Sequence, residues 1–259
     1  MRVLLLGVVV VAALLWECAG AHAARGPPVV CVHGYNGTAT DFDVLREALA
    51  RQQPAQTLYV LQSNDLAASL LSIAEQTVRA LAELRALHTA HAAEFAAGFV
   101  LAGHSLGALV ARSMLETEPL PVLHYVSIAG VQNGLFVLSH FFIDDDDDTI
   151  GNSYGHCSQY SRTPGATCEM TTREMYTAEA QATRAPANFW RAPQRTRYLR
   201  GNSFLPVLNN EVDATTPAAA QRKTNFLRAQ HFTFLVSPSG LPPLVVSCLS
   251  HCCHCLMSH

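Results

Sequence analysis

The chain has 259 residues, of which 49% are hydrophobic and 14% are charged, and its formal net charge is −3. This composition lacks the concentrated basic charge that phosphate backbones require, so nucleic acid is not an expected partner. A chain of this length can bury one large core, and α/β folds of this size often form a single domain.

The first residues have the order of features found in a secretory signal peptide. Residues 1–24 begin with a basic position, continue through the apolar run Val3–Trp16 and end at the small residues around Ala23. A single membrane anchor is the alternative, but the apolar run stops at Glu17, short of the roughly 20 residues that span a bilayer. We therefore expect cleavage near Ala23 and a mature protein without a stable membrane span, in a lysosome-like compartment or outside the cell.

Short apolar runs alternate with segments of helical periodicity along the next part of the chain. This alternation predicts a mostly parallel sheet flanked by helices on both faces. The predicted strands are Pro28–Val32, Thr57–Leu61, Gly98–Ala102, Leu123–Ala129 and His231–Val236. The predicted helices are Asp41–Arg51 with Thr40 as N-cap, Leu66–Phe95 as one helix or two broken near His88, and Ala108–Glu116.

The alternating pattern fails between about residues 131 and 211. This stretch is rich in Gly, Asn, Asp, Pro and Ser, and only the region near Thr171–Arg184 predicts a helix. We expect it to form a cap or lid over the carboxyl edge of the sheet. Residues 25–240 then form one domain, and residues 241–259 form a tail rich in Cys and His.

The segment Gly103-His104-Ser105-Leu106-Gly107 lies between an apolar strand and a helix. This context is typical of the nucleophile elbow of the α/β-hydrolase fold, whereas the short pattern alone is common. Glycines at positions 103 and 107 permit a sharp turn that exposes the Ser105 hydroxyl. Ser105 is therefore the predicted nucleophile; the alternative is that it only caps the helix.

The second half of an oxyanion hole is expected after the first strand, at His33-Gly34. In this fold the backbone N–H groups of Tyr35 and Leu106 would converge on the carbonyl oxygen of the substrate. His33 is more plausibly a structural residue that holds the loop by hydrogen bonds than a general base.

The rest of a catalytic triad is not found in the sequence. In this fold the acid and then the histidine follow the serine, and the acid comes just after a late strand. Here the strand His231–Val236 is followed by Ser237–Gly240, and no Asp or Glu occurs after Asp213. The triad Asp and His therefore remain unassigned.

Cysteines and acidic residues give further expectations. Cys157 and Cys168 flank a Pro-Gly turn, which favours a disulfide in an oxidising compartment, while Cys31 lies in an apolar strand as a buried free thiol. The acidic run Asp144–Asp148 predicts a solvated loop rather than a carboxylate metal site. Asn36 begins a glycosylation sequon, but a glycan there would obstruct the expected oxyanion loop, so low occupancy is predicted.

The chain resembles palmitoyl-protein thioesterases from about Pro28 to Val236. The segments that carry the resemblance are PVVCVHG at the first strand, the elbow GHSLGA, SIAGVQNGLF from Ser127, the Cys157 and Cys168 pair, NFWRAP from Asn188, YLRGNSFLPVLNNE from Tyr198, and KTNFLR from Lys223. The elbow is shared by many hydrolases, whereas the segments from Trp190 to Glu211 and the KTNFLR segment are more specific.

The resemblance implies hydrolysis of long-chain acyl thioesters, on S-palmitoylated proteins or small acyl thioesters, through an acyl-serine at Ser105. No cofactor or metal is implied. The chain departs from the family at Leu106, where Gln is usual, at Arg191-Ala192, where His-Asp commonly follows the tryptophan, and in extra residues between Cys168 and Asn188. It also departs after Val236, where the family's acid and histidine would follow.

The tail from Leu241 to His259 resembles nothing in the family, which suggests a truncated or misread gene product. The chain as written is therefore expected to have little turnover and an unpaired sheet edge beyond Val236. His251, His254 and His259 are candidates for a replacement base, which is disfavoured because no positioned acid would orient the imidazole. A zinc site formed by them with Cys248, Cys252, Cys253 and Cys255 is disfavoured by the close and irregular spacing of the ligands. Two alternatives stay open: a lipase or carboxylesterase acting on oxygen esters, and an inactive acyl-binding protein.

Overall fold

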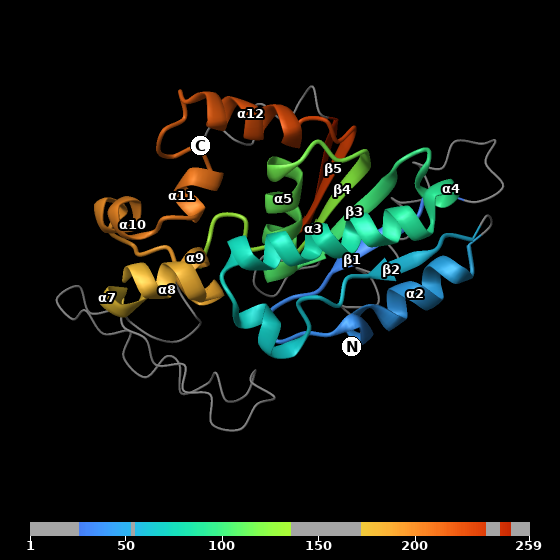
Figure 1. Ribbon diagram of the computed structural model, residues 1–259, viewed down its shortest axis with the longest axis horizontal. Helices are drawn as coiled ribbons and strands as arrows, with labels where there is room; N and C mark the ends of the chain where they lie inside the picture. The colour runs from blue at the N-terminus through green and yellow to red at the C-terminus, as the bar shows by residue number, and fades with distance from the viewer. Residues whose placement is uncertain (1–25, 53–54, 136–171, 237–243, 250–259) are drawn as a thin grey trace.

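A computed structural model describes residues 26–52, 55–135, 172–236 and 244–249 of the chain (Figure 1). The predicted signal peptide, the Cys157 and Cys168 pair, the Asp144–Asp148 run, most of the tail and half of the expected cap lie outside these residues. Among the residues that it does describe, no helix is long and apolar enough to cross a membrane.

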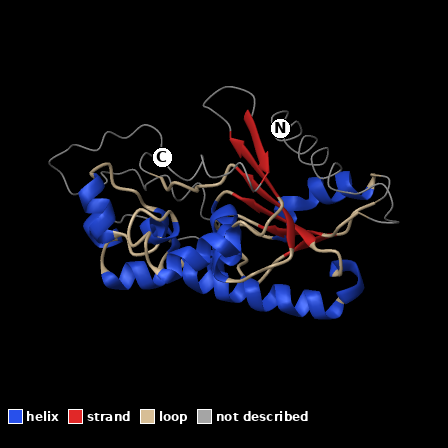
Figure 2. Ribbon diagram, turned by 90° about the horizontal axis from the view of Figure 1, so that it is seen from above, coloured by secondary structure: helices blue, strands red, loops and turns tan. Residues whose placement is uncertain are grey.

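A six-stranded sheet in the order β2-β1-β3-β4-β5-β6 forms the centre of the fold (Figure 2). Its strands are β1 (Val29–Val32), β2 (Leu58–Val60), β3 (Phe99–His104), β4 (Val122–Ile128), β5 (His231–Val236) and β6 (Leu244–Leu249). Strands β1 to β5 pair in parallel with their neighbours in the sheet. They correspond to the five predicted strands, all of which are confirmed. Their continuous apolar runs suit a parallel sheet that is buried on both faces.

The last strand corrects one expectation. β6 pairs antiparallel with β5 in a register that runs from Val236 opposite Leu244 to His231 opposite Leu249. The prediction that β5 would present an unpaired edge was wrong, because the apolar run in the tail supplies backbone N–H and C=O groups to that edge.

Two apolar clusters pack against opposite faces of the sheet. Val30 and Leu101 face the cluster that includes residues of α3 (Ile73–Ala90), α5 (Leu106–Thr117) and α12 (Pro217–Phe226). Val29 and Val100 face the cluster formed with α2 (Asp43–Ala50). Cys31 lies in the α2 cluster as a free buried thiol, as predicted, and burial raises its pKa.

The helices before the elbow differ in detail from the predicted ones. The first begins as a 3₁₀ turn, η1 (Ala39–Phe42), capped by Thr38 rather than Thr40, with the Thr38 N–H donating to Asp41 Oδ2 at 3.2 Å. The long predicted helix is divided into three pieces, and its last break falls at His91, three residues after the predicted position. These pieces are η2 (Leu66–Leu70), α3 (Ile73–Ala90) and α4 (Ala92–Phe95).

The second half of the described chain is more helical than expected. The predicted helix near Thr171–Arg184 appears as two short helices, and four others follow it that the sequence reading did not predict. In chain order they are α7 (Thr172–Met175), α8 (Ala178–Thr183), α9 (Ala185–Phe189), α10 (Arg195–Gly201), α11 (Leu205–Leu208) and α12 (Pro217–Phe226). Figure 1 shows α7 to α11 gathered beside the start of α3, far from α2 and α4.

Candidate functional site

The turn between β3 and α5 holds Ser105 in a strained backbone conformation. Ser105 has φ 54° and ψ −122°, its N–H donates to the Ile128 carbonyl at 2.9 Å, and its own carbonyl accepts from Ala108 N–H at 3.1 Å. A non-glycine residue at positive φ costs on the order of 1–3 kcal/mol and persists only where its surroundings fix it. The structure thus gives Ser105 the sharp strand-to-helix turn predicted for an elbow.

Both elbow glycines are required by close backbone contacts. A Cβ at Gly103 would lie 2.4 Å from Ala108 Cα, and one at Gly107 would lie 2.2 Å from the carbonyl oxygen of Val32. Distances this short are not tolerated between non-bonded heavy atoms. A side chain at either position would therefore collide with neighbouring backbone.

The loop after β1 lies against the elbow. A Cβ placed on Gly34 would be 3.1 Å from Ser105 Cβ, so the loop that carries Tyr35 passes directly beside the serine side chain. Leu106 is the first residue of α5, and the first N–H groups of a helix have no partner four residues earlier. The two segments predicted to form the oxyanion hole are thus adjacent; the donor roles of Tyr35 and Leu106 stay predictions.

His33 is a structural residue of this loop. Its side chain is fully buried, Nδ1 lies 3.0 Å from the carbonyl oxygen of Gly34, and Nε2 lies 2.8 Å from Asp65 Oδ1. The contact with Asp65 has the distance of an ion pair but not the alignment of a good hydrogen bond. Since both ring nitrogens face loop atoms, His33 is oriented to hold the loop, as the sequence predicted.

His104 is the other histidine of the site. It precedes Ser105 at the end of β3, and the residue as a whole is exposed. Desolvation by the surrounding protein nevertheless lowers the pKa of the imidazole, and the charge of Asp41 acts in the opposite direction. His104 is therefore biased towards its neutral form.

The acid and base of a triad are not assigned. Within the described residues, the Ser105 side chain makes no hydrogen bond to a histidine or a carboxylate. The tail residues His251, His254, His259, Cys252, Cys253 and Cys255 lie outside the part that the structure describes, and Cys248 lies on β6. No group of three or more His, Cys, Asp or Glu side chains that could hold a metal occurs in the described ranges.

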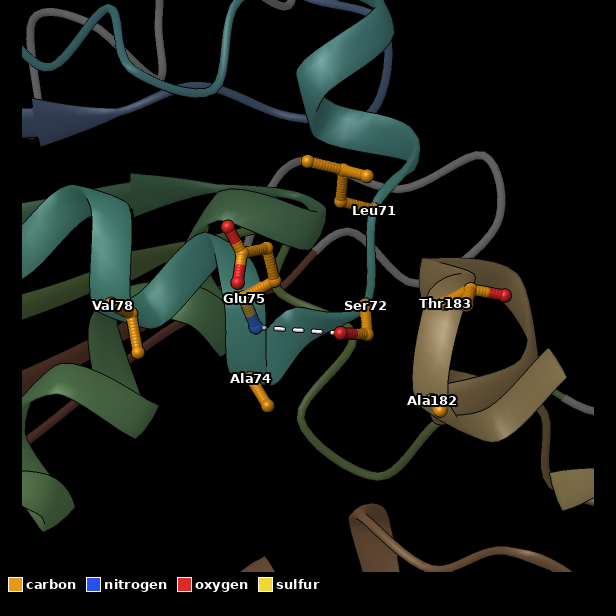
Figure 3. A pocket seen from close by; sticks show the side chains of 7 residues that line it. All are labelled: Leu71, Ser72, Ala74, Glu75, Val78, Ala182 and Thr183. Atoms are coloured by element: carbon orange, nitrogen blue, oxygen red, sulfur yellow. Dashed lines mark hydrogen bonds between the residues drawn. The ribbon is translucent and has the colours of Figure 1, made fainter. Parts of the chain in front are cut away.

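One pocket lies between the start of α3 and α8 (Figure 3). None of the predicted site residues lines it. Its lining consists of Leu71, Ser72, Ala74, Glu75, Val78, Ala182 and Thr183. The Ser72 hydroxyl caps α3 there by accepting from Glu75 N–H, so the pocket marks the junction of α3 with the helices that follow residue 171.

Comparison with known protein families shows the family to which most of the chain is related. The profile of the palmitoyl protein thioesterase family matches residues 28–240. The chain belongs to this family. No curated protein matches the chain at a significant level. Family membership, the parallel sheet and the elbow together assign the α/β-hydrolase fold.

Solved structures that match the chain are distant in sequence. The mature lipase BlEst2 of Bacillus licheniformis is 19% identical with a TM-score of 0.36, over 44% of this chain and 44% of that one. The thioesterase domain of the curacin biosynthetic pathway is 13% identical with a TM-score of 0.35, over 83% and 86%. The chain spans less than half the length of the first three structures that it matches, at 44%, 46% and 45%.

Arg191, one of the positions at which the chain departs from its family, makes a bidentate ion pair. Its guanidinium donates to both carboxylate oxygens of Glu211 at 2.7 and 3.1 Å and lies 4.3 Å from the ring centroid of Tyr198. The Tyr198 hydroxyl also donates a hydrogen bond to the Glu211 carboxylate. Burial is the main cause that raises the pKa of Tyr198, and the Glu211 carboxylate raises it further. Arg191 thus packs against Tyr198 of α10.

Sequence reading missed a buried charge on the helix behind Ser105. Arg112 of α5 donates to Glu116 Oε1 at 2.8 Å, to Asn209 Oδ1 at 2.7 Å and to the Leu208 carbonyl at 2.8 Å. Burial raises the pKa of Glu116, and Arg112 opposes that rise. The Arg-to-Glu spacing of four residues within an otherwise apolar helix was the available signal. The cluster fixes α5 to α11.

Proposed function

We propose that this chain hydrolyses long-chain fatty acyl thioesters, such as S-palmitoylated proteins or small acyl thioesters, with Ser105 as the acyl acceptor. The observation that carries the proposal is the strained Ser105 turn, enclosed by Gly103, Gly107 and the Gly34 loop in a chain of the palmitoyl protein thioesterase family. The signal peptide expected at residues 1–24 supports action in the secretory pathway, in a lysosome-like compartment or outside the cell.

The proposed reaction proceeds in two steps. Ser105 Oγ attacks the thioester carbonyl carbon, its proton passes to a base, and the oxygen that becomes negative is held by the backbone N–H groups of Tyr35 and Leu106. The C–S bond then breaks, and the thiol leaves with a proton. Water attacks the acyl-serine, releasing the fatty acid and restoring the Ser105 hydroxyl.

Turnover of matched palmitoyl substrates tests this proposal. Because neither the acid nor the histidine of a triad is assigned, we expect the 259-residue chain to be slow, yet faster than Ser105→Ala on a palmitoyl thioester. Ser105→Ala should retain only the part of the rate enhancement that comes from substrate binding and oxyanion stabilisation.

Two outcomes would replace the proposal with another function. Faster hydrolysis of the matched oxygen ester, still dependent on Ser105, would indicate a lipase or carboxylesterase. Equal rates for the unmodified chain and Ser105→Ala, together with saturable palmitate binding, would indicate an inactive acyl-binding protein.

A further inference from the structure

A short 3₁₀ helix, η2, lies beside the loop that borders Ser105. The Asn36 N–H donates to Ser69 Oγ at 2.6 Å, and the Leu66 N–H donates to the Gly37 carbonyl at 2.9 Å. Ser69 is only 1% exposed, although it lies 33 residues from Asn36 in the sequence. Two hydrogen bonds therefore join η2 to the residues that directly follow Tyr35.

The Ser69 hydroxyl both accepts and donates a hydrogen bond. While its oxygen accepts from Asn36, its hydrogen is donated to the Leu66 carbonyl at 2.6 Å. Asn36 and Leu66 both have positive φ, at 53° and 50°, and such backbone is stable only where several contacts fix it. Ser69 thus connects two strained residues through one hydroxyl.

The position of Ser69 is fixed in turn by buried amides. Gln76 Nε2 donates to the carbonyl oxygens of Ser69 at 2.8 Å and Leu71 at 2.7 Å. At the start of α3, the Ile73 N–H donates to Asn188 Oδ1 of α9 at 2.8 Å. A buried polar network with satisfied partners is rigid, so the loop beside Ser105 is tied through η2 and the start of α3 to α9.

We propose that Ser69 is a positioning residue for the reaction at Ser105. By holding the Asn36 N–H, it fixes the peptide plane that follows Tyr35, next to the plane that carries the Tyr35 N–H, the proposed oxyanion donor. Such a donor acts only within about 2.7–3.1 Å of the developing charge, and a displacement of about 1 Å costs about 100-fold in rate. The expected effect of Ser69 on the reaction rests on the proposed function. The hydrogen bond by which Ser69 holds the loop does not depend on that function.

Hydrogen exchange of the full chain tests the hold on the loop. Ser69→Ala removes both bonds of the hydroxyl, so the amides of residues 33–38 should exchange about 5- to 10-fold faster, the effect of losing roughly one hydrogen bond. The matched control is Thr77→Val, which removes another buried hydroxyl bond, from Thr77 Oγ1 to the Ile73 carbonyl at 2.7 Å, without touching the loop. Unchanged exchange at residues 33–38 in Ser69→Ala would overturn the proposal.

The rate at which a fluorophosphonate probe labels Ser105 tests the catalytic part, because the phosphonyl oxygen also develops negative charge. Ser69→Ala should label about 10- to 100-fold more slowly, Thr77→Val should label at the unmodified rate, and Ser69→Thr, which keeps the hydroxyl, should recover part of the loss. Faster exchange with an unchanged labelling rate would refute the positioning role.

The remaining outcomes also decide between the proposals. If the unmodified chain fails to label at Ser105, the proposed function fails, and exchange at residues 33–38 alone supports or refutes the hold by Ser69. If Ser69→Ala does not fold, Ser69→Cys, which weakens both bonds at similar volume, is measured in the same two assays.

Discussion

The sheet with its elbow and the helices from α7 to α11 are stabilised in different ways. Strand residues such as Val30, Leu101 and Tyr125 are buried among apolar neighbours and paired along a parallel ladder. The α7–α11 segment instead depends on buried side-chain amides, chiefly Gln181, Asn188 and Asn202, which bond to backbone groups. An apolar core tolerates conservative exchange, whereas a buried amide has few substitutes, because removing it leaves its partners unpaired.

The largest expected effect on stability is that of Asn202→Ala. The Asn202 side chain is buried and bonds to the carbonyl oxygens of Ala187, Asn188 and Trp190 and to the N–H groups of Phe204 and Leu205, at 2.8–3.2 Å. Unpaired buried groups cost about 1–3 kcal/mol each, so we expect unfolding in urea to show a loss of about 4 kcal/mol. The exposed Gln194→Ala should change stability by less than about 0.5 kcal/mol. Equal losses of stability in Asn202→Ala and Gln194→Ala would contradict the claim that the α7–α11 segment depends on its buried amides.

The elbow should respond to added volume rather than to a lost polar group. Gly107→Ala places a Cβ within 2.2 Å of the Val32 carbonyl oxygen, and we expect a loss of about 3 kcal/mol together with slower labelling of Ser105. The comparison is Gly26→Ala, whose nearest contacts would be with the Gln56 side chain rather than with backbone. Wild-type stability in Gly107→Ala would show that the turn is looser than these contacts indicate.

Acid should weaken the sheet through His124. This buried residue bonds to Thr233 Oγ1 at 2.8 Å, and burial, followed by the charge of His231, lowers its pKa to about 4. Because the folded pKa lies below the unfolded value, the neutral ring contributes stability above pH 6.5 that is lost as pH falls towards 4. Linkage gives a loss of about 2 kcal/mol from pH 7 to 5. Urea unfolding of His124→Gln should show a flatter pH dependence; an identical pH dependence would exclude His124 as the cause.

The smallest expected effect concerns glycosylation of the loop beside the elbow. Asn36 is 6% exposed and has φ 53°, so its side chain is not presented for a glycan once the loop has folded. Intact-mass analysis of the secreted chain should find Asn36 mostly unmodified, and Thr38→Ala should leave the mass distribution unchanged apart from the substitution. Full occupancy of Asn36 in a chain that labels at Ser105 would contradict the placement of this loop.

Strands and elbow were predictable because their signals are local. A run such as Val29–Val32 is apolar on both faces, which suits the centre of a parallel sheet, and the glycine spacing around Ser105 reflects contacts within a few residues. The predicted N-cap failed by two residues because Thr38 and Thr40 are chemically equivalent candidates. The feature that separates them is local, since Asp41, three residues after Thr38, completes a capping box with it.

The later helices were missed for a different reason. α9 to α11 have four to seven residues each, too few for an apolar period, and they are held by long-range bonds such as those of Asn202. α12 did carry a readable signal, since Thr216 caps a helix that begins at Pro217. For the site, sequence predicted Ser105 and the loop beside it. The buried role of Ser69 had no local pattern, because its partner Asn36 lies on a different segment.

The most direct test of the central claim is the site of covalent labelling by a fluorophosphonate probe, because only an activated serine reacts readily with it. Incubation of the 259-residue chain followed by peptide mass spectrometry should place the probe on Ser105, and Ser105→Ala should remain unlabelled under the same conditions. A folded chain that stays unlabelled, or that carries the probe on another residue, would contradict the assignment of Ser105 as the nucleophile.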